Sequence, residues 1–570
     1  MLSFRRLAYV LLVVFFSCCV FMIYNINEQK NKVVKIESVD VCEEPLVQGQ
    51  ELKHDKNIQY YVIGSNTEDS YGKIFSNVCA LMENLKISYI KESFVTNKSL
   101  QNLNSVLIFC DDTISEYVDL VKLVEFIEAG GKVVFSAGIA EGYEDSYLLP
   151  VLGIVEKGLK GHYFEFSFKE SYFPIQEDYM KYDGFSSSTW LSLRGEAFVY
   201  IETKDNGAPI VYKHPYEKGE VLVINGLFLE DNRYIGFLTA GLSVFLDAFI
   251  YPILGVETVY LDNFPIVTYA NDAKCLEVYG RTTESFVRDV IWPEFLGIAV
   301  KNNLKYTSSV LGVSSDEDSF PVISESLFNT MGKSALQYGG EMIYAVDCTD
   351  DTEIYLNEKF VTSFTRTFLN YEISSMAMLS NSSIDEAKRF IGEDISAVRG
   401  SINAQIEKDR IFFGDEYFVF PELTNGLDLQ NRNMLAISSG LSSYGAVSHT
   451  FDINELLVMD ENKSGWDKSK KELGEFSEKI FEKTSYLKKV TLKETKNIVK
   501  SYENLDYEYK KNGDKLTLQV NNYIVGQPFF YRTEKEIESV TGADIEKIEN
   551  NYYILRVKDS VVTLTMSEGE

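Results

Sequence analysis

Histidine is scarce in this chain of 570 residues. Its only histidines are His54, His162, His214 and His449. No two of them have the spacing His-x-x-x-His or His-x-x-His that holds a catalytic zinc on one element. The sequence also lacks a P-loop, a Gly-x-Ser-x-Gly elbow and a Gly-x-Gly-x-x-Gly loop. It therefore gives no support for the phosphoryl, acyl or hydride transfer that those motifs serve.

Cysteine is also uncommon, with seven in the chain. Cys18 and Cys19 lie inside an apolar run near the start. The others are Cys42, Cys79, Cys110, Cys275 and Cys348. These five are irregularly spaced and no Cys-x-x-Cys occurs, so neither a disulfide scaffold nor a thiolate metal site is expected. We expect small buried apolar residues, and one disulfide stays an open alternative.

Basic residues are outnumbered, because 55 Lys and Arg stand against 85 Asp and Glu, for a net charge of −30. Such a surface repels a phosphate backbone, which excludes a nucleic-acid partner. Hydrophobic residues make up 45% of the chain. At roughly 150 residues per domain, the length predicts a multidomain protein of three or four units.

The first 30 residues predict a membrane anchor. Arg5 and Arg6 precede an unbroken apolar run, residues 7–24, which is long enough to cross a bilayer as a helix. The basic residues before the run place the N-terminus in the cytoplasm and the bulk of the chain outside, on a single-pass cell-membrane protein. A cleaved signal peptide is the alternative. Residues 31–56 are polar and without period, as expected of a stalk.

Residues 57–255 alternate between strand and helix patterns. Strands are expected at 58–63, 105–110, 132–136 and 219–226, with helices at 72–85, 120–127 and 235–250. This rhythm predicts a parallel sheet with covering helices. It resembles the flavodoxin-like domain of class I glutamine amidotransferases, a Rossmann-like fold. Without that family's Gly-x-Cys-x-Gly elbow, and with no evident base near Ser136, we predict a non-catalytic binding or spacer module.

Residues 256–460 predict an α/β barrel. A buried strand runs from Val256 into Asp262-Asn263-Phe264-Pro265, and short βα units continue to about Glu455. Loops that follow strand ends are where such barrels collect their chemistry.

The last two units differ in period. Residues 461–505 form a helical connector, in which Thr491 and Glu494 have the spacing of a capping box. From 506 to 570 the apolar residues alternate with a period of two, which predicts an antiparallel β-sandwich. The chain as a whole is of the α/β class.

Four segments resemble the NodB-homology superfamily of polysaccharide deacetylases, and most closely its membrane-anchored Pel-type exopolysaccharide members. They are residues 260–265, the Trp292-Pro293 helix, residues 304–307 and residues 445–449. The resemblance implies a deacetylase barrel that acts on a polysaccharide, with a divalent metal, zinc, if the protein is active.

The same resemblance implies roles for four residues. Asp262 corresponds to the catalytic base, His449 to the general acid and Arg399 to the arginine that holds the base. Asn263 stands where the family has a metal-binding aspartate. The stretch that corresponds to the family's histidine motif, residues 339–347, contains no histidine. Two other outcomes stay open, a surface salt bridge for Arg399 and a structural role for His449.

Two other carboxylate groupings are candidate oxygen ligands or solvated turns. They are the loop with Asp347, Asp350, Asp351 and Glu353 and the pair Asp415-Glu416.

Two functions follow as hypotheses. The first is a membrane-anchored, extracytoplasmic deacetylase-like protein of exopolysaccharide production or modification. The second is a non-catalytic relative that guides polymer beside an exopolysaccharide synthase complex. Its groove would be lined by Tyr260, Phe264, Tyr269 and Trp292, which suit sugar faces and equally suit a core. No cofactor besides the metal is expected.

Overall fold

The computed structural model describes most of the chain. The described residues are Phe15, Ser17, 45–49, 52, 58–140, 145–184, 186–266, 272–321, 324–348, 354–368, 371–380, 384–391, 395–401, 412–413, 417–457 and 465–567. Apart from Phe15 and Ser17, the predicted anchor lies outside them, as does most of the predicted stalk. Within the described ranges, no helix combines the length and apolar character that crossing a membrane requires.

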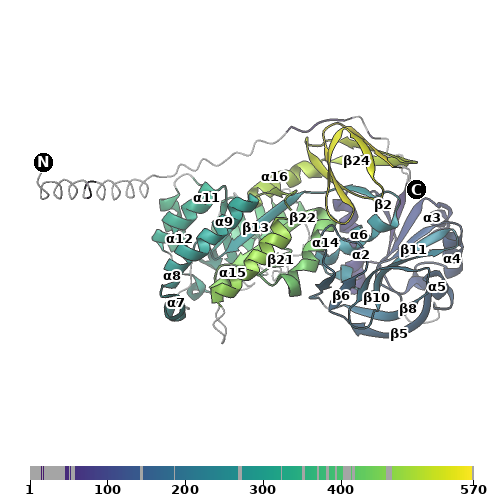
Figure 1. Ribbon diagram of the computed structural model, residues 1–570, viewed down its shortest axis with the longest axis horizontal. Helices are drawn as coiled ribbons and strands as arrows, with labels where there is room; N and C mark the ends of the chain where they lie inside the picture. The colour runs from purple at the N-terminus through teal and green to yellow at the C-terminus, as the bar shows by residue number, and fades with distance from the viewer. Residues whose placement is uncertain are drawn as a thin grey trace, which may run out of the picture.

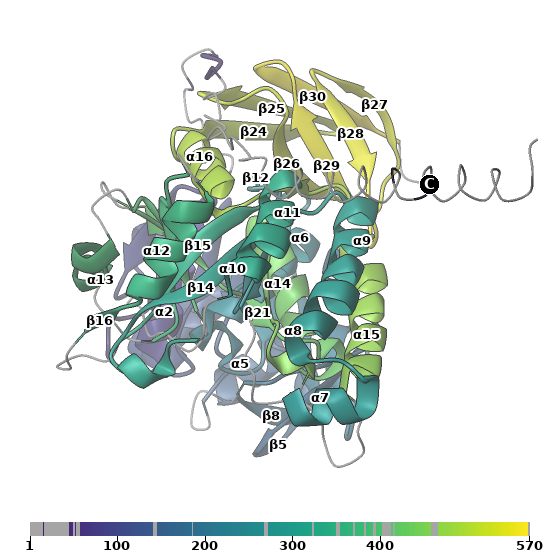
Figure 2. The ribbon, with the colours of Figure 1, turned by 90° about the vertical axis from the view of Figure 1, so that its left-hand side faces the viewer.

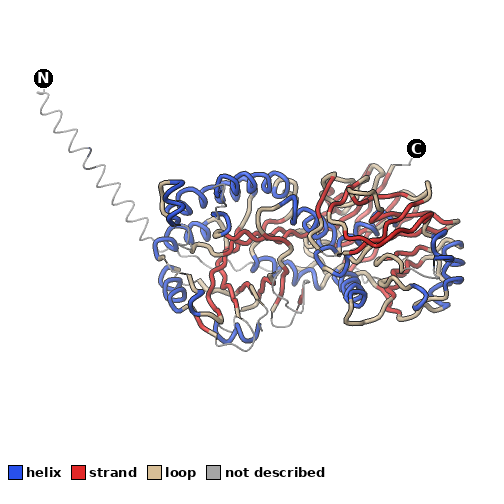
Figure 3. Tube along the Cα trace, turned by 90° about the horizontal axis from the view of Figure 1, so that it is seen from below, coloured by secondary structure: helices blue, strands red, loops and turns tan. Residues whose placement is uncertain are grey.

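The described chain forms an amino-terminal α/β domain, a half-barrel and a β-sandwich. The amino-terminal domain and the half-barrel lie side by side, and the sandwich lies above their junction (Figure 1). Seen from below, the helices of the half-barrel lie around its strands (Figure 3).

The amino-terminal domain is built on a nine-stranded sheet of order β2-β1-β3-β4-β11-β10-β9-β6-β7. Its first five strands pair in parallel, as predicted. They are β1 (Gln59–Ile63), β2 (Tyr89–Glu92), β3 (Ser105–Phe109), β4 (Lys132–Phe135) and β11 (Gly219–Ile224). Helices α2 (Ser70–Asn84), α4 (Leu120–Glu128) and α6 (Gly236–Phe245) present apolar faces to the sheet.

The other half of this sheet corrects the prediction of a purely parallel domain. Strands β10, β9, β6 and β7 pair antiparallel, and β5 with β8 forms a separate two-stranded ribbon. They are β5 (Ile154–His162), β6 (Glu165–Phe168), β7 (Tyr179–Lys181), β8 (Ser187–Leu193), β9 (Phe198–Thr203) and β10 (Pro209–Tyr216). Because polar residues interrupt most of these strands, their apolar residues form no long continuous run in the sequence.

The second sheet is a parallel half-barrel of order β19-β20-β18-β17-β15-β14-β13-β22-β21. Its strands alternate along the chain with helices, as in the predicted βα units, and the first begins at Val256 as predicted. They are β13 (Val256–Asp262), β14 (Tyr306–Ser314), β15 (Glu341–Asp347), β17 (Ser375–Met378), β18 (Ala397–Gly400), β20 (Phe418–Pro421), β21 (Thr424–Asn425) and β22 (Ala446–Asp452), with the short antiparallel β19 (Phe412–Phe413) and β16 (Tyr355–Leu356). Among the described strands β20 and β21 do not pair, so the sheet is open and not the closed barrel that the sequence analysis expects.

Helices cover the convex face of this sheet (Figure 2). They include α8 (Thr283–Phe286), α9 (Trp292–Asn302), α10 (Glu325–Leu327), α11 (Lys333–Gln337), α12 (Glu358–Thr367), α13 (Ile384–Ile391) and α15 (Gly465–Phe476). A π turn, Val287–Ile291, joins α8 to α9 just before Pro293. Since proline has no N–H to donate, it is tolerated where the α-helical ladder is already interrupted.

Two helices, of which α14 (Met434–Tyr444) is fully buried, fasten the half-barrel to the rest of the molecule. Helix α14 contacts α6 of the amino-terminal domain. Helix α16 (Leu492–Glu503) meets the amino-terminal ends of the strands, where the Leu492 amide donates to Thr307 at 3.0 Å. The predicted capping box of Thr491 and Glu494 is confirmed.

The β-sandwich consists of two four-stranded sheets. Their strands are β24 (Asp506–Asn512), β25 (Lys515–Asn521), β30 (Val561–Met566) and β27 (Ile537–Thr541) in one sheet, and β12 (Ile250–Pro252), β26 (Gln527–Arg532), β29 (Tyr552–Val557) and β28 (Ala543–Lys547) in the other. Strand β12 comes from the link between the first two domains. Val47, within the predicted stalk, pairs with Tyr523 of the sandwich, so part of that stretch is docked.

Cys79, Cys110, Cys275 and Cys348 are buried and form no disulfide. This confirms the expectation of small buried apolar residues for these four, while the other three cysteines lie outside the described residues.

Candidate functional site

Asp262 is the last residue of β13, at the carboxyl edge of the half-barrel sheet. Its carboxylate accepts two hydrogen bonds from Arg399, to Oδ1 at 2.7 Å and to Oδ2 at 2.8 Å. The Ser309 hydroxyl, at the paired position of β14, donates to Oδ1 at 2.5 Å. Because both oxygens are held, the plane of the carboxylate is set by its surroundings.

Arg399 lies on β18, three strands away from β14 across the concave side of the sheet. Its side chain is 0% exposed, and its guanidinium lies 4.9 Å from the centroid of the Tyr260 ring. Burial alone would lower the pKa of Arg399, but the carboxylates of Asp262 and Glu422 outweigh it and raise that pKa. Arg399 is therefore a permanent buried cation that positions Asp262, and it is not a surface salt bridge.

Asn263 follows Asp262 in the left-handed backbone region, with φ of 58°. Its side-chain amide donates to both carboxylate oxygens of Asp452, each at 3.0 Å. Asp452 ends β22 and stands in register with Asp262. Burial raises the pKa of Asp452 to about 6, although the bond from Asn263 acts in the opposite direction. Asp452 is a candidate acid or base that the sequence analysis misses.

The described residues do not fit the zinc site of the deacetylase resemblance. The amide nitrogen of Asn263 is directed at Asp452, and Asp262 is engaged by Arg399. The donors that meet at this edge are oxygen atoms, whereas zinc favours imidazole and thiolate. Among the residues described, no three His, Cys, Asp or Glu side chains are grouped as metal ligands. We derive no step through a metal.

Of the two carboxylate groupings, Asp347 is the one residue that lies in the described part of the chain. Asp347 ends β15 and is exposed. Asp350, Asp351, Glu353, Asp415 and Glu416 lie outside the described residues.

His449 does not face Asp262, contrary to the resemblance. It lies on β22 an odd number of residues before Asp452, and side chains alternate along a strand, so the two point to opposite faces. The His449 ring lies 4.2 Å from that of Phe476 on α15, and its Nδ1 is 2.7 Å from the Thr424 hydroxyl. Burial lowers the pKa of His449 to about 3. This geometry does not support the predicted role of general acid.

Of the two alternatives for the four aromatic residues, a glycan groove and a core, the core is confirmed for three. Tyr260, Phe264 and Trp292 are buried. The rings of Phe264 and Trp292 lie 4.5 Å apart within the core. Tyr269 lies outside the described residues. The described members therefore pack the half-barrel and do not line a surface.

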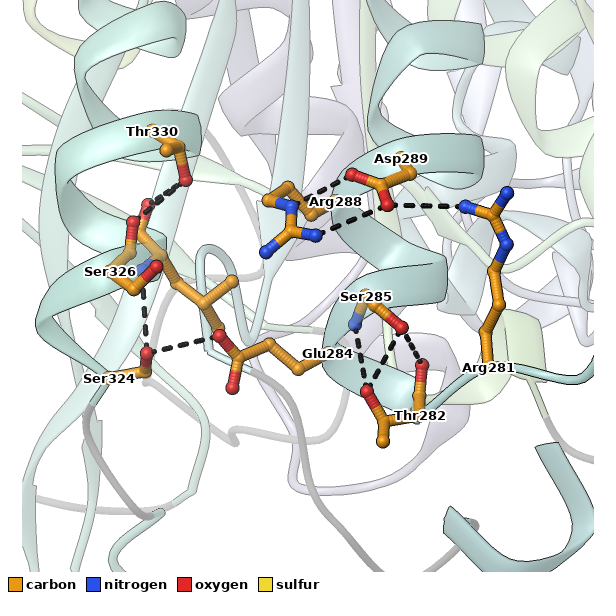
Figure 4. A network of polar contacts seen from close by, with 10 residues as sticks. Arg281, Thr282, Glu284, Ser285, Arg288, Asp289, Ser324, Ser326 and Thr330 are labelled. Atoms are coloured by element: carbon orange, nitrogen blue, oxygen red, sulfur yellow. Dashed lines mark hydrogen bonds and ion pairs between the residues drawn. The ribbon is translucent and has the colours of Figure 1, made fainter. Parts of the chain in front are cut away.

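Beyond the strand ends, the helices that follow β13 and β14 begin with a network of exposed polar residues (Figure 4). Asp289 accepts from Arg281 at 3.1 Å and from Arg288 at 2.8 Å. Ser324, which caps α10, donates to Glu284 of α8 at 3.4 Å. In parallel βα units these helix starts lie at the carboxyl edge of the sheet, so this part of the rim is polar and charged.

Solved structures with a similar fold include Agd3, a carbohydrate deacetylase, at 11% identity and a TM-score of 0.51, covering 90% of this chain and 99% of that one. This likeness shows the fold. A ThuA-like protein from Bacteroides uniformis ATCC 8492 covers 34% of this chain and 93% of its own at 10% identity and a TM-score of 0.26. A β-galactosidase from Bacillus circulans sp. alkalophilus covers 33% and 31% at 13% identity and a TM-score of 0.22.

No curated protein sequence matches this chain. One family model does, over residues 51–338 and 403–554, which is more than half of the chain. The chain therefore belongs to the family described as uncharacterised proteins conserved in bacteria, DUF2194.

Proposed function

We propose that this protein is a polysaccharide deacetylase-like protein that removes acetyl groups from an amino-sugar polymer at the carboxyl edge of the half-barrel. The observation that carries the proposal is the Asp262 carboxylate, held on both oxygens by the buried Arg399 in a fold similar to that of a carbohydrate deacetylase. A preorganised carboxylate at a strand end suits general-base chemistry.

In the proposed reaction, Asp262 takes a proton from a water molecule whose oxygen bonds to the acetyl carbonyl carbon. The carbon–nitrogen bond then breaks, the amine leaves with a proton and acetate is released. Arg399 and Ser309 orient the base and do not react. Asp452, on the same face of the sheet, is the described carboxyl group in register with Asp262 and can hold the proton that the amine receives.

The test uses the full chain and an oligomer of N-acetylglucosamine, with released acetate as the readout. Asp262→Asn keeps the size of the side chain and removes the base. Asp289→Asn, the same change in an exposed rim residue, is the matched control. Acetate release that falls at least a hundredfold with Asp262→Asn alone supports the proposal. Equal release by both variants and the unchanged chain contradicts it.

A non-catalytic glycan-binding scaffold is the second candidate. Two observations favour it, namely that His449 faces away from Asp262 and that the Asn263 amide is engaged by Asp452. In this case the protein binds the oligomer without releasing acetate. Calorimetric binding together with no acetate from the unchanged chain distinguishes the scaffold from the enzyme.

We also propose a location for the protein in the cell. The protein is held in the cell membrane by residues 1–24, with its domains outside the cell, and it handles an exopolysaccharide beside a synthase complex. Support comes from the apolar run and its flanking arginines. Fractionation of cells that carry the full chain and a chain without residues 1–24 tests the anchor. Membrane recovery of both forms would contradict it.

A further inference from the structure

Two carboxylates, Asp262 and Asp452, end neighbouring parallel strands at the carboxyl edge of the half-barrel. They are in register, so they lie on one face of the sheet. Carboxylates grouped at such an edge are ordinary ligands of a divalent cation. Whether this edge binds a cation therefore depends on the groups that already face each carboxylate.

The side chain of Asn263 faces Asp452. Its amide nitrogen is 3.0 Å from Oδ1 and 3.0 Å from Oδ2 of that carboxylate, so it lies midway between the two oxygens. A cation that binds a carboxylate through both oxygens takes the same place. The nitrogen of the amide is the atom that faces Asp452, because it carries hydrogens to donate and the amide oxygen carries none. At this carboxylate the amide and a cation therefore exclude each other.

Hydrogen bonds use most of the other acceptor sites of the two carboxylates. The backbone amide of Asn454 donates to Oδ1 of Asp452 at 2.8 Å. At Asp262 the two-oxygen position is taken by Arg399, at 2.7 Å and 2.8 Å, and the Ser309 hydroxyl donates to Oδ1 at 2.5 Å. A carboxylate has about four acceptor sites, so each of the two keeps few for another partner. Arg399 also neutralises the charge of Asp262, which weakens the attraction of that carboxylate for a cation.

The backbone at Asn263 shows how small the difference from a cation site is. Its φ of 58° lies in the left-handed region, which asparagine and aspartate adopt more readily than most other residues with a side chain. An aspartate at this position keeps the backbone and turns a carboxylate oxygen towards Asp452 in place of the N–H group. Two carboxylates that face each other favour a proton or a cation between them.

We propose that Asn263 takes the place of a divalent cation at this edge, so that the half-barrel site is built to work without a metal. Its amide holds Asp452, as Arg399 holds Asp262. If the protein removes acetyl groups, that reaction then needs no metal. This consequence rests on the proposed function, whereas the replacement of the cation by Asn263 does not.

The test measures binding of zinc, calcium and magnesium ions to the full chain by isothermal titration calorimetry, after removal of metals with a chelator. Asn263→Asp exchanges the amide for a carboxylate, and Asp452→Asn removes the carboxylate that the amide faces. Asn303→Asp is the matched control, because Asn303 also has a left-handed φ, of 56°, and is exposed at the end of α9.

We expect the unchanged chain and the Asn303→Asp control to bind the three ions equally weakly. Asn263→Asp should gain one site for calcium or magnesium that is at least about tenfold tighter. One zinc ion bound tightly by the unchanged chain and lost with Asp452→Asn overturns the inference. Binding by Asn263→Asp no tighter than by the control also overturns it. If Asn263→Asp does not fold, the zinc titrations of the unchanged chain and of Asp452→Asn decide.

Acetate release separates this inference from the proposed function. Release that a chelator leaves unchanged supports both. Release that stops with the chelator and returns with zinc overturns the inference and leaves the proposed function standing. Absence of release, together with equally weak binding by the unchanged chain and the control and the gain of a site in Asn263→Asp, removes the proposed function and leaves the inference standing.

Discussion

Arg399 and Asp262 form a two-point ion pair across the concave side of the half-barrel, from strands that β14, β15 and β17 separate. The guanidinium is 0% exposed and the carboxylate side chain 15% exposed. One partner is thus a buried fixed cation, and the other is presented at the strand end.

Replacing Arg399 by methionine is expected to cost about 3 kcal/mol of unfolding free energy, because a partly buried carboxylate then loses its partner. Arg366→Met is the control, since that arginine is 74% exposed beside Glu325 and its loss should cost under about 1 kcal/mol. Urea unfolding monitored by circular dichroism measures both. Equal costs would show that the buried pair does not stabilise the half-barrel.

The buried, neutral His449 should make the free energy of unfolding rise with pH. Its folded pKa of about 3 lies below its unfolded value of about 6.5, so the unfolded chain takes up the proton first. Its contribution is complete above pH 6.5 and is lost as the pH falls towards 3, by up to about 1.4 kcal/mol per unit. Urea unfolding at a series of pH values measures this effect. His449→Asn should reduce the change of unfolding free energy with pH, whereas His162→Asn, at an exposed histidine, should not alter it. An unchanged slope in the His449 variant would contradict the burial.

Asp452 should have the opposite effect, lowering the free energy of unfolding as the pH rises through part of the same pH range. Its pKa of about 6 in the folded protein exceeds the unfolded value of about 3.9, so its contribution is complete below pH 3.9 and is lost as the pH rises through 6. The direct measurement is a carbon-13 NMR titration of the carboxyl carbon, assigned by its absence in Asp452→Asn. A midpoint near 6 is expected, and a midpoint near 4 would refute the assignment.

Glu257 and Lys489 form a second buried ion pair, with side chains 0% and 4% exposed, to which the Thr484 hydroxyl is also bonded. Burial raises the pKa of Glu257 despite the neighbouring ammonium group of Lys489. Lys489→Met should cost about 3–5 kcal/mol, because Glu257 then stays buried without its cation.

The double variant Glu257→Leu with Lys489→Met should cost less than Lys489→Met alone, since no uncompensated charge remains. Lys301→Met breaks the exposed pair with Glu482, in which the side chains are 63% and 41% exposed, and should cost about 0–1 kcal/mol. A double variant less stable than the single one would contradict this explanation.

Much of the fold can be predicted from the sequence, since strands such as β3 and β11 are buried along most of their length and contain continuous apolar runs. The antiparallel strands from β5 to β10 escape prediction because polar residues interrupt most of them. The half-barrel's open edge depends on pairing between strands, which apolar runs do not encode.

The site is less predictable. Asp262 and Arg399 are 137 residues apart in the chain, so their contact follows from family resemblance and not from local pattern. The resemblance assigns His449 to the wrong face of β22. Because this strand is buried on both faces, its sequence does not show which residues point to which face, and a shift of one residue reverses the face of every side chain. Register with Asp262 would have identified Asp452, once the pairing of β13 with β22 was known.

The central claim is that Asp262, held by Arg399, is the base of a deacetylase. Its most direct test is the rate of acetate release from an N-acetylglucosamine oligomer by the Asp262→Asn chain, relative to the Asp289→Asn chain. The account predicts a ratio below about one in a hundred, with both variants folded, in keeping with the loss of a general base. A ratio near one, or no release by the unchanged chain, would contradict it.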